Sequence, residues 1–223
     1  MIELKDVHYQ IPSDNETLDI IKSCNLSVQP EEIVAIVGRS GSGKSTLLSL
    51  MAGLETPTQG EIHLLGENIT HYSEDQRAIL RAQQVGFIFQ NFQLMPSMSA
   101  LENILMPLEL FQVENAQQKA WHALQRVGLE NRAKHRPAEL SGGEQQRVAI
   151  ARAFVTEPKI LFADEPTGNL DEQTAQQIQQ LLFDLNRSQK TTLVVVTHDN
   201  GFAKLCQKTY RLTDGHLEMH TYA

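Results

Sequence analysis

The stretch that decides the fold is Gly38-Arg39-Ser40-Gly41-Ser42-Gly43-Lys44-Ser45. It matches the pattern G-x-x-x-x-G-K-S/T, in which glycines let backbone N–H groups turn inward around a polyphosphate. The apolar run Ile33–Val37 predicts a buried parallel strand before it, and the apolar residues after Lys44 predict a helix that Gly53 ends. The positive end of that helix favours an anion. We expect a phosphate-binding loop, whereas a glycine-serine turn with a chance lysine would leave the flanking elements unexplained.

Each polar residue of this loop has an expected role. Lys44 should reach the β- and γ-phosphates, the Ser45 hydroxyl should ligate Mg²⁺, and Thr46 should donate to the α-phosphate. The nucleotide contacts are expected from Gly38, Arg39, Ser40, Gly41, Ser42, Gly43, Lys44, Ser45 and Thr46.

Elements outward from the loop alternate between strand and helix. Further buried strands are predicted at Val85–Phe89, Ile160–Ala163 and Leu193–Val196, with an amphipathic helix around Ile178–Leu185. This alternation indicates an α/β fold, a P-loop NTPase with a parallel-sheet core.

The ends of the chain add shorter β elements. The first third predicts strands at Ile2–Tyr9, Leu26–Val28 and Glu61–Leu65, with a polar loop at Pro12–Glu16, so we expect an N-terminal antiparallel β part. Near the other end, Tyr210–Leu217 predicts a hairpin over Asp214-Gly215.

The middle of the chain reads as helical. Apolar residues between Leu101 and Leu108 recur at helical spacing, and Asn115 is expected to cap a helix that Gly128 closes. We therefore expect one domain over residues 1–223, with a nucleotide-binding core at about 1–90 and 156–223 and an inserted helical subdomain at 91–155.

Two adjacent carboxylates end one of the predicted strands. Asp164 should support Mg²⁺ through water, and strand alternation should turn Glu165 toward an attacking water. A carboxylate that orients or deprotonates water is worth roughly 10²–10⁴-fold in rate. A helix cap is the alternative role, but a bare carboxylate pair is costly without a cation.

A second anion site is predicted at Leu140-Ser141-Gly142-Gly143-Glu144-Gln145-Gln146-Arg147. Ser141 and Glu144 have the spacing of a capping box that opens a helix, and the glycines leave the first-turn N–H groups open. If this site and the phosphate loop lie at opposite edges of the fold, one chain cannot easily bring both onto the same γ-phosphate. A head-to-tail pair of chains can.

The amino-acid composition narrows the possible partners and the cellular compartment of the protein. The 223 residues carry 19 Lys and Arg against 27 Asp and Glu, a net charge of −8, which argues against nucleic acid as a partner. Cys24 and Cys206 are read as buried apolar residues in a reducing compartment. No signal peptide and no apolar run of membrane-spanning length is visible, so we expect a cytoplasmic chain.

LSGGEQQR followed by DEPTGNLD resembles the ATP-binding-cassette ATPases over essentially the whole chain. The segments FQNFQLMPSMSALENILMPL and LFADEPTGNLD are similar to the lipoprotein-release, macrolide-export and cell-division branch (LolD, MacB and FtsE), and the chain looks closest to the YbbA type within it. Glu31 departs from the family, which usually has glycine in the turn before the phosphate-loop strand.

The resemblance implies roles for several more residues. Tyr9 would stack on adenine, Gln90 would touch Mg²⁺ and the attacking water, and His198 would contact the γ-phosphate. Asn169-Leu170-Asp171 would cross a dimer interface, and each ATP bound by one chain would meet residues of the other: Ser141, Gly142, Gly143 and Gln145. Glu165, His198 and Gln90 form the expected catalytic set, with ATP and Mg²⁺ as cofactors.

The resemblance also implies a separate membrane permease with few spans and a large periplasmic part, moved mechanically from the cytoplasmic side of the bacterial inner membrane. We expect it to dock near Asn91–Met98, an apolar loop with Phe92, Leu94, Met95 and Met98, although the helical subdomain could instead cover that loop.

Two other classes of protein stay open. A cassette ATPase of DNA repair or translation would carry coiled-coil or zinc insertions or a second cassette, and a P-loop kinase would leave LSGGEQQR unexplained.

Overall fold

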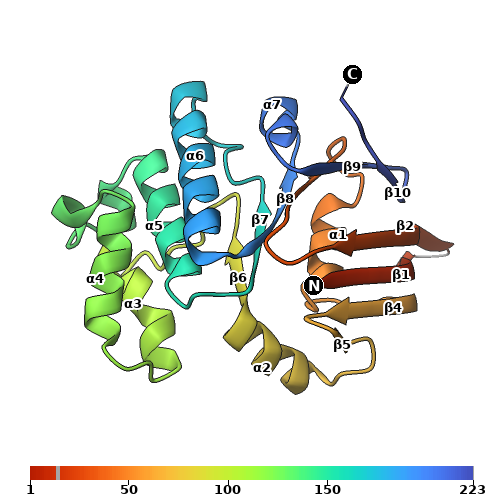
Figure 1. Cartoon of the computed structure of the whole chain (residues 1–223), viewed down its shortest axis with the longest axis horizontal. Helices are drawn as coiled ribbons and strands as arrows, with labels where there is room; N and C mark the ends of the chain where they lie inside the picture. Colours follow the sequence, from red (N-terminus) through yellow and green to blue (C-terminus); the bar gives the residue numbers. More distant parts are fainter. Residues whose placement is uncertain (14–15, 223) are drawn as a thin grey trace. The chain divides into compact units, whose positions relative to one another are not determined.

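The computed structural model describes residues 1–13 and 16–222 (Figure 1). The chain forms two compact units: Met1–Val85 with Thr192–Ala223, and Gly86–Thr191. The predicted polar loop Pro12–Glu16 is shorter than expected, because β1 runs to Ser13 and β2 starts at Glu16; its centre, Asp14 and Asn15, lies outside the described residues.

An antiparallel sheet forms the N-terminal part of the first unit, as predicted. Its strands follow the order β2-β1-β4-β5, and Figure 1 shows β1 between β2 and β4. Their bounds are β1 Ile2–Ser13, β2 Glu16–Val28, β4 Gln59–Leu64 and β5 Glu67–Asn68. Ile2 and Leu4 are buried while Glu3 and Lys5 are exposed, the alternation of a sheet with one covered face. The predicted short strand Leu26–Val28 is the end of the much longer β2.

Parallel pairing dominates the other sheet of the first unit, whose strands follow the order β10-β9-β3-β8. Their bounds are β3 Ile33–Val37, β8 Thr192–Thr197, β9 Lys208–Thr213 and β10 His216–Met219. β3 pairs in parallel with both β8 and β9, and every residue of β3 and β8 is buried. β10 returns antiparallel to β9 over Asp214 and Gly215, both at positive φ, which confirms the predicted hairpin.

Helices of the first unit are α1 Lys44–Met51, α2 Glu74–Gln84 and α7 Asn200–Lys204. α1 was predicted, and Gly53 follows its end at φ 68°. The sequence pattern does not predict α2, because most of its residues are polar and none of them is buried. Its signal is a capping box between Ser73 and Gln76.

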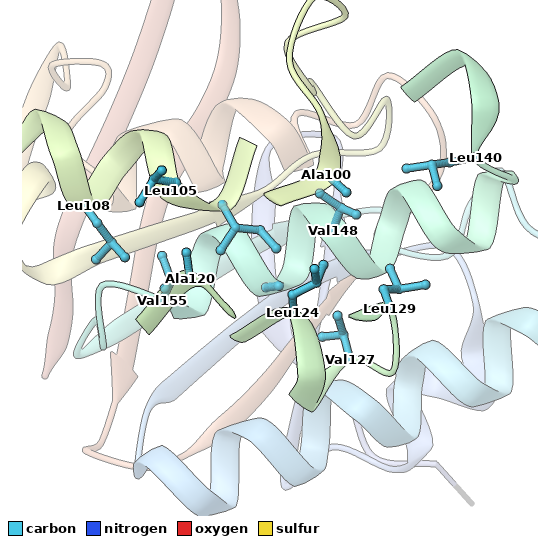
Figure 2. Packing of buried hydrophobic residues seen from close by; sticks show 12 residues of the cluster. Ala100, Leu105, Leu108, Ala120, Leu124, Val127, Leu129, Leu140, Val148 and Val155 are labelled. Atoms are coloured by element: carbon cyan, nitrogen blue, oxygen red, sulfur yellow. The ribbon is translucent and has the colours of Figure 1, made fainter. Parts of the chain in front are cut away.

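The second unit is mainly helical and also contains β7 Ile160–Asp164, which lies next to β6 Val85–Ile88. Its helices are α3 Ala100–Leu110, α4 Ala116–Arg126, α5 Gly142–Phe154 and α6 Glu172–Gln189, with 3₁₀ turns η1 Glu130–Arg132 and η2 Pro137–Glu139. Leu108, Ala120, Leu124 and Val148 are among the buried residues that join α3, α4 and α5 into one core (Figure 2).

One predicted helix cap is wrong. Asn115 precedes α4 but has left-handed backbone, φ 56°, and in the part of the chain that the structure describes its side chain makes no capping hydrogen bond. An asparagine tolerates left-handed φ better than most residues, so Asn115 turns the chain into the helix instead of capping it.

Glu31 occupies a turn that suits glycine. The φ of Glu31 is 65°, and the Glu31 N–H donates to Thr192 Oγ1 at 2.9 Å. The next residue closes the turn, because the Glu32 N–H donates to the Gln29 carbonyl at 3.3 Å. The turn keeps its shape although this residue carries a Cβ, at a cost of about 1–2 kcal/mol for left-handed backbone.

We predict that Glu31→Gly raises the free energy of unfolding by up to about 1 kcal/mol, since relief of the left-handed backbone outweighs the entropy that glycine adds to the unfolded chain. Denaturant unfolding measures it. Glu31→Ala is the control: it removes the exposed side chain but keeps the strain, and should change stability by less than about 0.5 kcal/mol. A loss of stability in Glu31→Gly alone would contradict this account.

Candidate functional site

The phosphate loop links the carboxyl end of β3 to the start of α1. Gly43 has φ 96°, and a Cβ there would lie 3.1–3.3 Å from Ile20 and Ile21, so only glycine fits both the backbone angle and the space. Lys44 is buried, and its Nζ donates to the carbonyls of Gly38 and Arg39 at 3.0 Å each. These bonds hold a positive charge inside the loop.

The same unit brings His198 to this loop. His198 directly follows β8, whose last residue Thr197 pairs with Val37. A cavity of about 550 Å³ is lined by Gly38, Arg39, Ser42 and His198, together with Asn200 and residues of β9 and its turn. Two residues predicted from separate motifs, the loop and the histidine, therefore share one cavity.

Tyr9 lies on β1 of the first unit and is half-buried. Its hydroxyl donates to Glu55 Oε2 at 3.1 Å, and burial, followed by that carboxylate, raises the pKa of the phenol. The hydroxyl is thus held at one end of the ring. The expected stacking of Tyr9 on adenine stays a prediction.

The carboxylates Asp164 and Glu165 lie in the second unit, and both are half-buried. β7 ends at Asp164, so the expectation that strand alternation directs Glu165 is wrong. Glu165 has left-handed backbone, φ 47°, and its carbonyl accepts from the Gly168 N–H at 3.1 Å. A strained turn at the strand end therefore sets its direction, and strain of this kind is concentrated at functional sites.

Gln90 is bound to the loop that carries Asn169. Asn169 Nδ2 donates to the Gln90 carbonyl at 3.0 Å, and Gln90 Nε2 donates to Asn169 Oδ1 at 3.4 Å. The sequence reading named both residues but predicted no contact between them. Two hydrogen bonds thus join the glutamine predicted to contact Mg²⁺ to the loop predicted to cross the dimer interface.

The capping box at the start of α5 is confirmed. Ser141 Oγ accepts from the Glu144 N–H at 3.2 Å, and Glu144 Oε2 accepts from the Ser141 N–H at 2.8 Å. That backbone bond, with Arg132 Nε on Oε1 at 2.9 Å, holds the pKa of Glu144 below its usual value. Gln145 donates to the Leu140 carbonyl at 3.1 Å, so its amide also stabilises the turn before the helix.

The two glycines of this helix differ in their surroundings. A Cβ at Gly143 would lie 2.5 Å from Thr174 Cγ2 on α6, whereas one at Gly142 would meet nothing nearer than Leu170 Cδ2 at 3.5 Å. Gly143 is therefore required for helix packing in addition to any contact with an anion.

The loop after Gln90 is fastened by two side chains that the sequence reading missed. Asn103 is fully buried in α3; its Oδ1 accepts from the Met95 N–H at 2.7 Å and its Nδ2 donates to the Met95 and Met98 carbonyls at 3.2 Å. Arg152 donates to the carbonyls of Phe92 and Gln93 at 2.9 and 2.7 Å. Both Phe92 and Gln93 have positive φ.

The predicted apolar cluster of this loop is only partly exposed. Leu94 packs against the core of α3, α4 and α5, and Phe92 and Met98 are half-buried, whereas Met95 is 43% exposed. No feature of the sequence distinguishes the partly buried leucine from the exposed methionine, because the distinction depends on which side chain packs against this core.

The predicted site residues form two groups. The first unit holds Tyr9, the phosphate loop and His198; the second holds Gln90, Asp164, Glu165 and Ser141–Gln145. Within residues 1–13 and 16–222, no helix is long and apolar enough to cross a bilayer.

Comparison with known proteins finds a matching family and similar chains. The family model described as ABC transporter matches residues 21–168. The chain is 46% identical over 220 residues to YbbA of Escherichia coli K12, an uncharacterized ABC transporter ATP-binding protein, which covers 98% of this chain and 96% of that one. It is 45% identical over 219 residues to LolD of Pseudomonas fluorescens, the ATP-binding protein of a lipoprotein-releasing system, at 97% and 96% coverage.

Solved structures agree with the sequence relatives. A dimeric ATP-binding cassette, MJ0796, in a post-hydrolysis state with ADP and Pi, has a TM-score of 0.90 and 38% identity, and covers all of both chains. A second dimeric structure of that cassette has the same TM-score and 39% identity.

We predict that Gly143→Ala lowers the free energy of unfolding by about 1–3 kcal/mol, because the new methyl group overlaps Thr174. Gly142→Ala should not lower it. Thr174→Ser removes the clashing Cγ2 and should restore the stability of Gly143→Ala. Denaturant unfolding of the three single variants and of the double variant Gly143→Ala/Thr174→Ser measures this. Equal losses for the two glycines would show that packing against Thr174 does not distinguish them.

Proposed function

This chain belongs to the ABC transporter family, and we propose that it is the subunit that binds and hydrolyses ATP to drive a separate membrane permease. The observation that carries the proposal is the cavity in which the phosphate loop and His198 meet. Backbone N–H groups at the start of α1 and the ammonium of Lys44 suit a polyphosphate, and His198 reaches the same space from β8.

We assign to the side chains the roles that the sequence motifs predict. Lys44 and the loop bind the phosphates, Thr46 donates to the α-phosphate, and Tyr9 stacks on the adenine. Glu165 orients or deprotonates the attacking water, and His198 contacts the γ-phosphate. The hydrogen bond between Gln90 and Asn169 supports a further role for Gln90, the coupling of the nucleotide site to the dimer interface. A movement of Gln90 would be transmitted to the interface loop that carries Asn169.

The donor set suits Mg²⁺. Among the described residues no group of three or more His, Cys, Asp or Glu side chains could hold a metal ion. Mg²⁺ needs no such cage, because it keeps waters and binds through one or two protein oxygens and substrate phosphates. The Ser45 hydroxyl, the Asp164 carboxylate and the Gln90 amide oxygen would supply those contacts. The ion would neutralise charge on the phosphates.

Two copies of the chain would complete each site. The capped start of α5 presents N–H groups and a positive helix end, which suits a phosphate bound by the other copy. Ser141, Gly142, Gly143 and Gln145 of one chain would then face the loop of its partner in a head-to-tail dimer. The dimeric cassette of similar structure supports this arrangement.

The relatives support a particular kind of partner. Those with 45–46% identity include the ATP-binding protein of a lipoprotein-releasing system and YbbA. We place this chain on the cytoplasmic face of the inner membrane, attached to a permease of the lipoprotein-release or macrolide-export type that ATP-driven closure moves mechanically.

Glu165→Gln tests the catalytic role. The amide retains the shape of the carboxylate but cannot act as a base, so we expect ATP turnover to fall by at least about 100-fold while ATP still binds. The ATP-bound dimer should accumulate, which size exclusion with ATP detects. Lys44→Ala is the contrasting variant, because it should weaken ATP binding itself. Wild-type turnover in Glu165→Gln would remove Glu165 from this role.

Met95→Glu tests docking of the permease at residues 91–98. Met95 is the exposed apolar side chain of the loop, so a charge there should abolish co-purification with the permease and permease-stimulated turnover, while basal ATPase activity and melting temperature stay unchanged. Met219→Glu, the same change at an exposed methionine on β10, is the matched control. Undiminished co-purification of Met95→Glu would reject docking at this loop, and capture of ribosomes or DNA would favour a cassette without a permease.

A further inference from the structure

The segment after β10 packs against the first unit beside the phosphate cavity. Tyr222 and Cys206 contact a small buried cluster of Ala35, Val37 and Ala203. The Tyr222 ring lies 5.2 Å from Lys204 Nζ and meets His220 edge-on at 4.7 Å. The His220 N–H donates to the Thr209 carbonyl at 2.8 Å, which fixes the segment to β9.

Two side chains of this segment bind residues that line the cavity. The Tyr222 hydroxyl donates to Asn200 Oδ1 at 3.3 Å, and burial raises the pKa of Tyr222, so this donor stays protonated. Arg211 Nη2 lies 3.0 Å from His220 Nε2. Because arginine can only donate, His220 accepts through Nε2 in this pair. Asn200 and Arg211 both line the cavity that His198 shares with the phosphate loop.

The connection to His198 is short. His198 lies between Thr197, the buried end of β8, and Asp199, the N-cap of α7. The Asp199 N–H donates to Thr197 Oγ1 at 3.0 Å, and Asp199 Oδ1 accepts from the N–H groups of Gly201 and Phe202. α7 has only five residues, so its own hydrogen bonds orient it weakly, and the tie from Tyr222 to its first residue restrains the backbone that carries His198.

We propose that Tyr222 and His220 are positioning residues for ATP hydrolysis, which hold Asn200 and Arg211 so that His198 stays in place against the γ-phosphate. The inference rests on the proposed function, in which His198 is that contact. Restraint of a catalytic side chain by its neighbours affects turnover more than binding, because a small misplacement of the reacting groups costs rate. The ATP affinity should depend mainly on the phosphate loop.

Tyr222→Phe is the direct test, since it removes the bond to Asn200 and keeps the ring on its cluster. We expect kcat to fall about 3- to 10-fold, with ATP affinity within about 2-fold and an unchanged melting temperature. Asn200→Ala should reproduce the effect, and the double variant should lose no more than either single one, because both remove the same interaction. His220→Ala should also lower kcat, through Arg211.

The matched control is Tyr72→Phe, because the Tyr72 hydroxyl donates to Glu67 at 2.6 Å elsewhere in the same unit and should not affect kcat. A kcat of Tyr222→Phe within about 1.5-fold of wild type, or a fall in melting temperature with kcat and KM unchanged, overturns the inference. Absence of ATP hydrolysis by the wild-type chain, or full activity of His198→Ala, overturns the proposed role of the site itself, so the two failures are distinguishable.

Discussion

The parallel register of β3 with β8 and β9 is the constraint on which the first unit depends. β3 is fully buried, and its backbone donors and acceptors are satisfied by a strand on each side, so it cannot slip without losing hydrogen bonds that no water would replace. In this register Val37 lies between Thr197 and Arg211. The phosphate loop, His198 and the turn after β9 therefore emerge together at the carboxyl edge, where open α/β sheets hold ligands.

A different principle orders the irregular segments of the second unit. A loop cannot satisfy its own backbone groups, and here side chains from neighbouring helices do so. Asn103 binds the loop from α3, Arg152 binds it from α5, and Asn169 binds the Gln90 carbonyl. Each of these side chains bonds to the backbone of the loop, so these restraints do not depend on the side chains of the residues that they hold. An exposed residue such as Met95 can therefore vary without disturbing the path.

What the sequence predicts well is what local patterns determine. The buried strands, the phosphate loop, the hairpin at Asp214-Gly215 and the capping box at Ser141 all depend on residues within a few positions of one another. α2 was missed because most of its residues are polar. The extension of β1 and β2 was missed because polar residues there are held by cross-strand pairing. The family resemblance, not periodicity, identified Gln90, Tyr9 and His198.

Other features depend on tertiary contacts that no local pattern encodes. Asn103 looks like an ordinary polar residue of a helix until the loop packs over it. Leu94 and Met95 look alike until Leu94 packs against the core of α3, α4 and α5. The direction of Glu165 depends on a left-handed residue after β7, which the strand pattern alone could not reveal. Glu31 shows the opposite case: the missing glycine was visible in the sequence, and the turn forms regardless.

The packing of Cys206 against the same small cluster as Tyr222 has a consequence for the redox chemistry of the chain. Cys206 is only partly buried, unlike the fully buried Cys24, yet burial raises the pKa of each thiol to about 12. At neutral pH such thiols stay protonated, whereas oxidants and electrophiles attack the thiolate. The Cys206 thiol, which donates to the Phe202 carbonyl, is therefore a latent nucleophile. Its reactivity depends on whether the segment that buries it stays packed on that cluster.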